Sequence, residues 1–252
     1  MDETLLRSLL KGAAPLQVYD EVDSTNRVVR AWAAQGAPHG AAVIALRQSA
    51  GRGRLGRAFY SPPGGLYLSV LVRYGIASPG SLTTLAAVAV LQAVQAVLQK
   101  GLHIKWVNDL LLDGKKVCGI LTESIVWDNT IQAAVVGIGI NVDRTDFPDE
   151  IAGKAGSLLL GAAAPGVKER LAAAVVNGLL SGIDAMPGHM AAYRANCLTL
   201  GAQVRFEQAG AVRQGIAAAI GDQGELLIDT PDGWVTLMSG EASVRMEDGR
   251  YV

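Results

Sequence analysis

Gly51-Arg52-Gly53-Arg54-Leu55-Gly56 is the stretch that decides the fold class of this chain. Its spacing matches the G-x-G-x-x-G fingerprint of dinucleotide-binding loops. That fingerprint works only where a helix begins at its end and presents free N–H groups to a pyrophosphate. Here Pro62 and Pro63 follow soon after, so we expect a loop over residues 49–57 with strands on both sides. The sequence therefore argues against a doubly wound dinucleotide-binding fold.

The segments around this loop follow a pattern typical of an α+β fold. Apolar alternation indicates strands, and apolar positions at helical spacing indicate helices. The sequence predicts strands over residues 17–22, 42–48, 66–73, 103–107, 117–124 and 130–141, and helices over residues 26–35, 81–100, 165–186 and 190–196. Asp113-Gly114 marks a hairpin turn. Because most strands follow one another in hairpin-like order, we expect an α+β layer.

The character of the chain changes beyond Gly201. Short alternating runs separated by Gly-containing turns indicate a small all-β barrel. The runs cover residues 203–206, 212–220, 225–228 and 234–238. We therefore predict a domain boundary near Leu200, with a catalytic domain over residues 1–200 and a barrel over residues 201–252.

Composition limits the possible functions. Half of the 252 residues are apolar and 18% are charged, which excludes a mainly disordered chain. The formal net charge is −1, so any basic site must be local. Cys118 and Cys197 are too few for a disulfide framework, and with three scattered histidines we expect no zinc site. These features predict a cytoplasmic protein.

One long uncharged run, over residues 74–99, has the length of a membrane span. Its first half contains Pro79 and several hydroxyl residues, and Gln92, Gln95 and Gln99 form a polar stripe at helical spacing. We therefore expect a helix of a soluble domain and no membrane association. The first residues also lack the pattern of a signal peptide.

Arg52, Arg54 and Arg57 lie within the glycine-rich loop. Glycines let the backbone approach a ligand, and guanidinium groups bind phosphate or carboxylate in pairs of hydrogen bonds, so the loop suits an anion. A solvated turn or an RNA-contacting element would have the same composition. Lys105 at a strand end is either a point charge for a reacting phosphate or a surface lysine.

Taken together and in order, five runs resemble the biotin protein ligases. They are Asp23-Ser24-Thr25-Asn26, Gln48-Ser49-Ala50-Gly51-Arg52-Gly53-Arg54-Leu55-Gly56-Arg57, Lys105-Trp106-Val107-Asn108-Asp109-Leu110, Lys116-Val117-Cys118-Gly119-Ile120-Leu121-Thr122-Glu123 and Gly137-Ile138-Gly139-Ile140-Asn141-Val142. The likeness resumes at Gly221-Asp222-Gln223-Gly224 and at Gly240-Glu241-Ala242-Ser243-Val244-Arg245. Each run alone is weak, but their joint order and spacing are specific.

The resemblance implies a catalytic domain like that of class II aminoacyl-tRNA synthetases, followed by an SH3-like barrel. It implies activation of biotin with ATP and Mg²⁺ to biotinyl-5′-AMP, with release of pyrophosphate. Transfer to one lysine of a biotin carboxyl carrier domain of a biotin-dependent carboxylase would follow. Members of the family also form dimers, and a homodimer stays open here.

The resemblance also implies which residues hold the substrates. Those expected to bind biotin are Ser24, Thr25, Asn26, Gln48, Arg52, Gly53, Arg54, Lys105 and Gly119. Those expected to bind ATP or the adenylate are Arg54, Arg57, Phe59, Lys105, Asn141 and Arg245. Lys105, Arg52 and Arg54 are expected to be catalytic, with Lys105 bridging the biotin carboxylate and the α-phosphate. No residue is assigned to a metal.

The sequence departs from the family pattern at Val107, Leu55 and Phe59, where proline, arginine and tryptophan are frequent. We expect small effects, since Phe59 keeps an aromatic face for adenine. Only about twenty residues precede Glu21, so we expect no DNA-binding domain and no DNA partner. The alternatives are a lipoate or octanoate protein ligase, a biotin-binding sensor without transfer, and an RNA-binding module.

Overall fold

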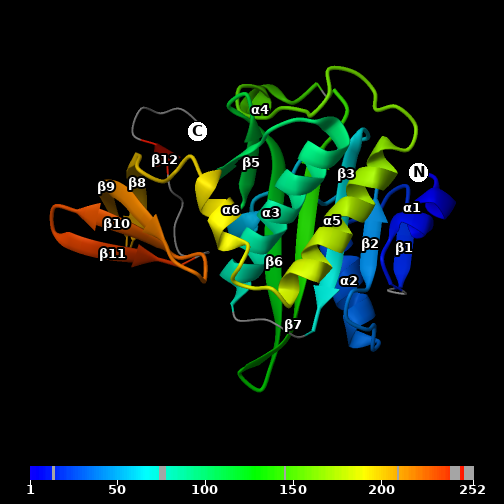
Figure 1. The fold of residues 1–252 in the computed structure, drawn as a ribbon, viewed down its shortest axis with the longest axis horizontal. Coiled ribbons are helices and arrows are strands. Elements are labelled where there is room, and N and C mark those ends of the chain that lie inside the picture. The colour runs from blue at the N-terminus through cyan, green and yellow to red at the C-terminus, as the bar shows by residue number, and fades with distance from the viewer. Residues whose placement is uncertain (13–14, 74–77, 145, 209, 239–244, 247–252) are drawn as a thin grey trace.

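The large sheet of the molecule has seven strands in the order β1-β2-β3-β7-β6-β5-β4 (Figure 1). The strands are β1 (Leu16–Tyr19), β2 (Ala42–Ala45), β3 (Gly65–Val72), β4 (His103–Lys105), β5 (Asp109–Leu112), β6 (Lys115–Trp127) and β7 (Thr130–Asn141). Only β1 and β2 pair in parallel, and the other neighbours are antiparallel. The predicted α+β class is therefore confirmed. Strand β5, which leads into the predicted hairpin turn, was not predicted.

The structure is a computed structural model that describes the chain except residues 13–14, 74–77, 145, 209, 239–244 and 247–252, and it gives only the backbone of residues 208, 245 and 246.

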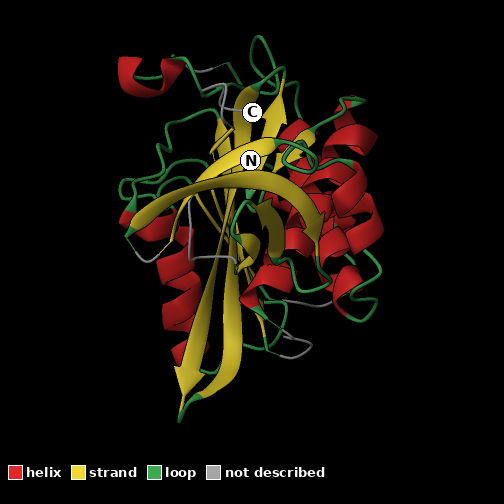
Figure 2. Cartoon of the chain, turned by 90° about the vertical axis from the view of Figure 1, so that its left-hand side faces the viewer, coloured by secondary structure: helices red, strands yellow, loops and turns green. Residues whose placement is uncertain are grey.

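Helices cover both faces of the large sheet (Figure 2). They are α1 (Glu3–Leu9), α2 (Thr25–Ala34), α3 (Pro79–Leu98), α4 (Asp149–Ala152), α5 (Val167–Ile183) and α6 (Met190–Ala195). One core lies between the sheet and the pair α3 and α5, where Leu68, Leu85 and Leu179 are buried. A smaller core lies under α2, around Val29 and Val43. The glycine-rich loop contains only a short 3₁₀ turn over Arg54–Gly56, and no α-helix follows it before β3.

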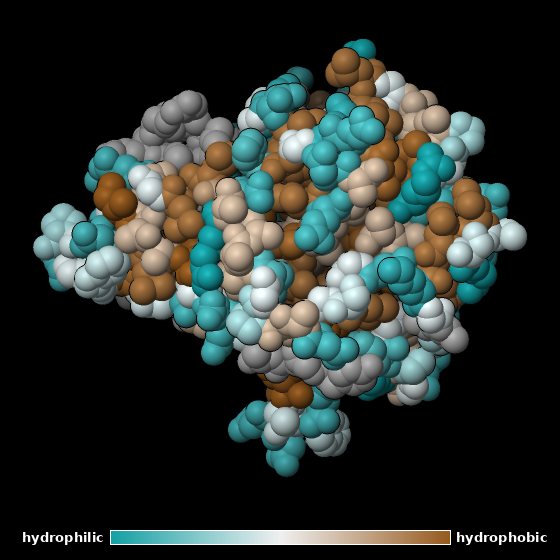
Figure 3. All heavy atoms as spheres, in the orientation of Figure 1, coloured by the Kyte–Doolittle hydropathy of each residue, from teal (hydrophilic) through white to brown (hydrophobic). Residues whose placement is uncertain are grey.

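The apolar run predicted as a helix forms α3. Ser78 and Ser81 make a reciprocal capping box, and Pro79 occupies the first turn, so the helix starts sharply. By length and composition α3 could cross a membrane, yet two thirds of its most apolar window is buried inside the protein, as in a core helix. Its outer side keeps Gln92 and Gln95 exposed, and the face around α3 and α5 is a mosaic of hydrophilic and hydrophobic residues (Figure 3).

The hairpin of β6 and β7 extends past the neighbouring strands and projects from the molecule (Figure 1). At its tip Asp128 and Asn129 both have positive φ, 48° and 54°. This is the backbone of a type I′ turn, in which Asn and Asp tolerate the left-handed region. The turn, together with the register shift between Ile125 and Val126, sets the register that places Gly119 opposite Gly139 and Leu121 opposite Gly137.

The last part of the chain forms a separate five-stranded antiparallel sheet in the order β11-β10-β9-β8-β12. The strands are β8 (Gln203–Gln208), β9 (Ala211–Ile220), β10 (Leu226–Thr230), β11 (Gly233–Leu237) and β12 (Arg245–Met246). Their inner side buries Val204, Phe206, Ile228 and Leu237. This SH3-like sheet lies beside α6 and the lower end of α3 (Figure 1).

Candidate ligand site

A pocket lies where the glycine-rich loop, the start of α2 and the middle of β6 and β7 meet. Its free volume is about 50 Å³. The lining residues that the sequence predicted are Ser24, Thr25, Asn26, Gln48, Arg52, Gly53, Arg54, Phe59 and Gly119. The others are Asn108, Lys116, Ile120, Leu121, Gly137, Ile138 and Gly139. Segments from four distant parts of the sequence therefore converge on one site.

Three glycines form the floor of the pocket. Gly119 and Gly139 face each other on β6 and β7, and Gly137 is two residues away. A Cβ at Gly139 would lie 2.5 Å from the Phe59 ring, and one at Gly119 would lie 2.8 Å from it. A Cβ at Gly137 would overlap the amide of Asn26. Because these three positions carry no side chain, the Phe59 ring and the Asn26 amide can lie against the strands, and the cavity remains open beside them.

The inner end of the pocket, at the start of α2, is lined by uncharged polar side chains. Thr25 donates its backbone N–H to Gln48 Oε1 at 2.8 Å. The Ser69 hydroxyl lies 2.7 Å from Thr25 Oγ1 and 2.6 Å from Asn26 Oδ1. Ser24 begins α2 without using its side chain as a cap, although it is only 2% exposed. Hydroxyl and amide groups are therefore packed around one end of the cavity.

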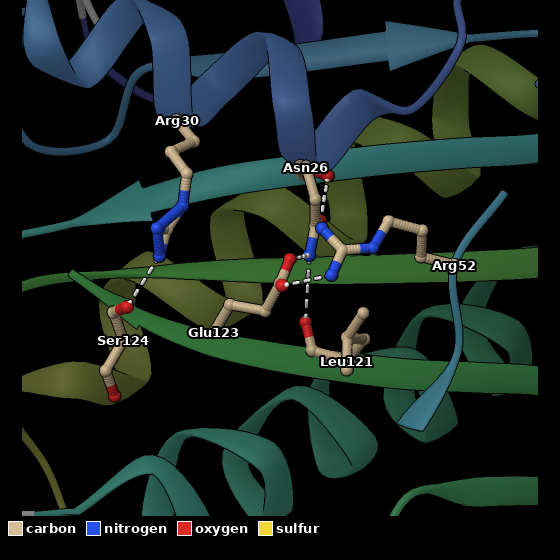
Figure 4. A network of polar contacts seen from close by, with 7 residues as sticks. Asn26, Arg30, Arg52, Leu121, Glu123 and Ser124 are labelled. Carbon is tan, nitrogen blue, oxygen red and sulfur yellow. Dashed lines mark hydrogen bonds and ion pairs between the residues drawn. The ribbon is translucent and has the colours of Figure 1, made fainter. Parts of the chain in front are cut away.

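Asn26 joins this end to β6 (Figure 4). Its amide nitrogen donates to Glu123 Oε2 at 2.8 Å and lies 3.4 Å from the Leu121 carbonyl oxygen. Glu123 also pairs with Arg52, with 3.3 Å between Oε1 and Nη2. Arg52 thus reaches across the site from the glycine-rich loop (Figure 4). Sequence reasoning missed Ser69, which lies in none of the quoted runs, and Glu123, which ends the run over residues 116–123 but was given no role.

The opposite end of the pocket is cationic. Arg54 Nη1 donates to Asn108 Oδ1 at 2.9 Å, and burial lowers the pKa of the guanidinium. Among the described residues, Arg54 Nη2 is one of the buried polar atoms without a hydrogen-bond partner. Lys116 Nζ lies 2.6 Å from Asp109 Oδ1 and 5.6 Å from the centre of the Phe59 ring. A buried, unsatisfied donor beside a lysine suits an anionic ligand.

Four predicted residues do not line this pocket. Lys105 is 9% exposed at the end of β4, where its backbone pairs with Asp109. Asn141 donates its amide to the Gly156 carbonyl oxygen at 2.9 Å. Arg57 is exposed on the loop, and its carbonyl accepts from Gly53 N–H. For Arg245 the structure gives only backbone pairing in β12, so the predicted contact lies outside the described part of the chain. The roles of these four stay predictions.

Comparisons with known proteins agree on one family. The chain matches a model of the biotin/lipoate A/B protein ligase family over residues 18–141. It also matches a model of the biotin protein ligase C terminal domain over residues 199–245. The structure of biotin protein ligase from Aquifex aeolicus in complex with biotin and ATP superposes with a TM-score of 0.79 at 28% identity, covering 92% of this chain and 99% of that one.

Curated relatives also match most of the chain. The bifunctional ligase/repressor BirA of Bacillus spizizenii is 34% identical over 88% of this chain and 71% of its own length. The biotin–[acetyl-CoA-carboxylase] ligase of Mycobacterium tuberculosis is 38% identical over 96% of this chain and 94% of its own length. The predicted resemblance is thereby confirmed, and the chain belongs to the biotin protein ligase family.

Proposed function

We propose that this chain activates biotin with ATP and transfers it to a lysine of a biotin carboxyl carrier domain. In the first step a biotin carboxylate oxygen attacks the α-phosphorus of ATP, the bond to the β-phosphate breaks, and pyrophosphate leaves. In the second step the carrier amine attacks the biotinyl carbonyl carbon and loses a proton, and AMP leaves. The observation that carries the proposal is a pocket with an uncharged polar end, a glycine floor and a cationic end.

The polar end fits the ureido ring of biotin. That ring offers two N–H donors and one carbonyl acceptor and carries no charge. Hydroxyl and amide groups around the cavity supply both hydrogen-bond donors and hydrogen-bond acceptors; they belong to Ser24, Thr25, Asn26 and Gln48. Burying a charged group against a neutral ring would cost more free energy than burying these hydroxyl and amide groups. We therefore place the ureido ring at the start of α2 and the carboxylate at the far end.

The cationic end fits the reacting groups. A carboxylate and an α-phosphate repel each other, so fixed cations supply much of the acceleration. Lys116 and Arg54 line the pocket there. We therefore propose that Lys116 takes the bridging role that the family resemblance implies for Lys105, while Arg54 holds the phosphate. Lys105 lies beside the site, because its backbone in β4 pairs with Asp109 in β5.

Ligand binding requires the pocket to open. Its volume of about 50 Å³ is far below the roughly 300 Å³ at which small-molecule sites begin. The Phe59 ring fills the space above Gly119 and Gly139. We propose that Phe59 and the glycine-rich loop move outward as biotin enters and then close over the adenylate. Closure would keep water from the reactive anhydride.

The remaining expectations concern the metal, the cellular compartment and the domain boundary. Among the described residues no three His, Cys, Asp or Glu side chains gather to hold a metal ion. Since Mg²⁺ is usually held by substrate phosphates and water, we propose that it enters with ATP. Cys118 and Cys197 are buried and unpaired by a disulfide, which suits the cytoplasm. We also keep the boundary near Leu200, just before β8 begins.

Exchange of labelled pyrophosphate into ATP tests this function, with biotin, lipoate and octanoate as parallel substrates. We expect exchange with biotin alone. Exchange with lipoate or octanoate would instead identify the related ligase activity. Mass spectrometry of a carrier domain incubated with biotin and ATP tests the transfer step, with a Lys→Arg carrier variant as control. No exchange with any of the three acids would contradict the proposal and would favour a protein that binds biotin without activating it.

A further inference from the structure

The segment Trp106–Asp109 is shared by the ligand pocket and the C-terminal part of the chain. On the pocket side Asn108 accepts from Arg54 Nη1, and Asp109 pairs with Lys116. Asn108 is also tied to β6, because its amide donates to the Ile120 carbonyl oxygen at 3.0 Å. The position of both cations therefore depends on where this short segment lies.

The opposite side of the segment is held by residues that follow in the chain. Trp106 donates its backbone N–H to Thr199 Oγ1 at 3.0 Å and its indole N–H to the Gly224 carbonyl oxygen at 2.9 Å. The Tyr193 hydroxyl donates to the Val107 carbonyl oxygen at 3.0 Å. All three hydrogen bonds are buried. Buried bonds of this kind fix geometry because each broken one leaves an unsatisfied group.

Gly224 ends the turn Gly221-Asp222-Gln223-Gly224 of the small sheet, and this turn is itself fixed. Gly224 has φ +86°, and a Cβ there would lie 3.2 Å from the Gly80 carbonyl oxygen in α3. Ser78 donates to the Gln223 carbonyl oxygen at 3.3 Å. Arg194 pairs with Asp222 at 2.5 Å. The Gly224 carbonyl oxygen, which accepts from the Trp106 indole, is thus held in place by contacts between the small sheet and the large domain.

We propose that the C-terminal sheet positions the cations of the active site through Trp106, an inference that rests on the proposed ligase function. The turn 221–224 holds the indole, the indole holds the segment 106–109, and the segment holds Arg54 and Lys116. Trp106 and Tyr193 are positioning residues, since neither lines the pocket. A shift of about 1 Å in catalytic groups can cost about a hundredfold in rate, so this support affects kcat.

Kinetics of the full chain test the proposal. Trp106→Phe removes the indole donor and keeps an aromatic ring, and Tyr193→Phe removes one hydroxyl. Each should lower kcat for biotin-dependent pyrophosphate exchange by about 10- to 100-fold. The KM for biotin should change less than about threefold, because the ureido end of the pocket is remote from the segment. Thr230→Val is the matched control: it removes a partly buried hydrogen bond from the Thr230 hydroxyl to the Gly233 carbonyl oxygen within the small sheet, and kcat should stay unchanged.

Coupling separates positioning from general loosening of the structure. If Trp106 acts through the Lys116 pair, Trp106→Phe should add little to the loss already caused by Lys116→Met. Full additivity of the two losses would overturn the proposal. So would a kcat for Trp106→Phe equal to that of Thr230→Val, with both variants folded by circular dichroism. Wild-type chain that exchanges no pyrophosphate would refute the ligase function itself, whereas active wild type with unaffected variants refutes only this inference.

Discussion

Lys116→Met is the substitution that separates the two candidate catalytic lysines. Methionine keeps most of the length and apolar character of the lysine stem and removes the charged Nζ, which lies over the Phe59 ring, 5.6 Å from its centre. Lys105→Met is the matched control, because Lys105 is also largely buried and lies in β4, on the far side of β5 from the strand that carries Lys116. If the lysine that lines the pocket is the catalytic one, Lys116→Met should abolish most of the adenylation and Lys105→Met should not.

The size of the effect follows from the site. A unit charge about 4 Å from the reacting groups contributes about 4 kcal/mol at an effective dielectric of about 20. The Asp109 carboxylate, 2.6 Å from Lys116 Nζ, reduces this contribution by partly neutralising the charge. The Lys116 side chain is 23% exposed, so solvent and salt screen the charge further. Removal of one preorganised charge-stabilising group typically costs about 10²- to 10³-fold in kcat. We therefore expect Lys116→Met to lose about 10²- to 10³-fold in kcat.

Biotin-dependent pyrophosphate exchange at saturating ATP and biotin measures this loss, and thermal unfolding checks the fold of each variant. Because Lys116→Met leaves the Asp109 carboxylate without its ion pair, the double variant with Asp109→Asn shows how much of the effect comes from that uncompensated charge. Near-normal exchange by Lys116→Met together with a large loss in Lys105→Met would refute the reasoning and restore the prediction from the sequence.

Three further predictions use other parts of the structure. Gly137→Ala should weaken biotin binding about tenfold by calorimetry, because its methyl group displaces the Asn26 amide and removes about one hydrogen bond's worth of affinity. Burial lowers the pKa of His189 to about 4, so the unfolded chain binds more protons between about pH 6.5 and 4, and stability falls as pH decreases through this range. Urea unfolding of His189→Gln should lack that contribution, which reaches at most about 1.4 kcal/mol per pH unit. Burial also raises the pKa of the Cys118 thiol, so a thiol reagent should not label it until the chain unfolds.

Local patterns in the sequence predict most of the fold. The α3 helix follows from its apolar run and N-terminal serine cap, and the hairpin of β6 and β7 follows from alternation on both sides of a polar turn. The glycine-rich loop is predicted correctly as a loop because prolines follow it. Strand β5 was missed because the polar pair Asn108-Asp109 at its start resembles a turn, although Asp109 already pairs with Gly119.

Contacts between distant segments explain what sequence reasoning missed in the site. Ser69 lies in no motif, and Glu123 ends a family-like run without an assigned role. Both contact Asn26 because β3 and β6 pass beside the start of α2. The residues that were predicted, such as Thr25 and Gln48, lie in runs that resemble a known family. Their meeting in one pocket depends on the sheet order, which brings β2, β3 and β6 under one loop although they are far apart in sequence.

The identity of the pocket lysine depends on a β-bulge that alternation cannot reveal. On a regular strand Lys116 and Gly119, three residues apart, would point to opposite faces. Asp109 pairs with Gly119 and Leu111 pairs with Lys116, so Val117 has no partner of its own in β5. The extra residue brings Lys116 to the face that carries Gly119 and Asp109, where its ion pair forms. A regular pairing would leave the site without this cation, so the bulge is what gives the glycine floor a charged end.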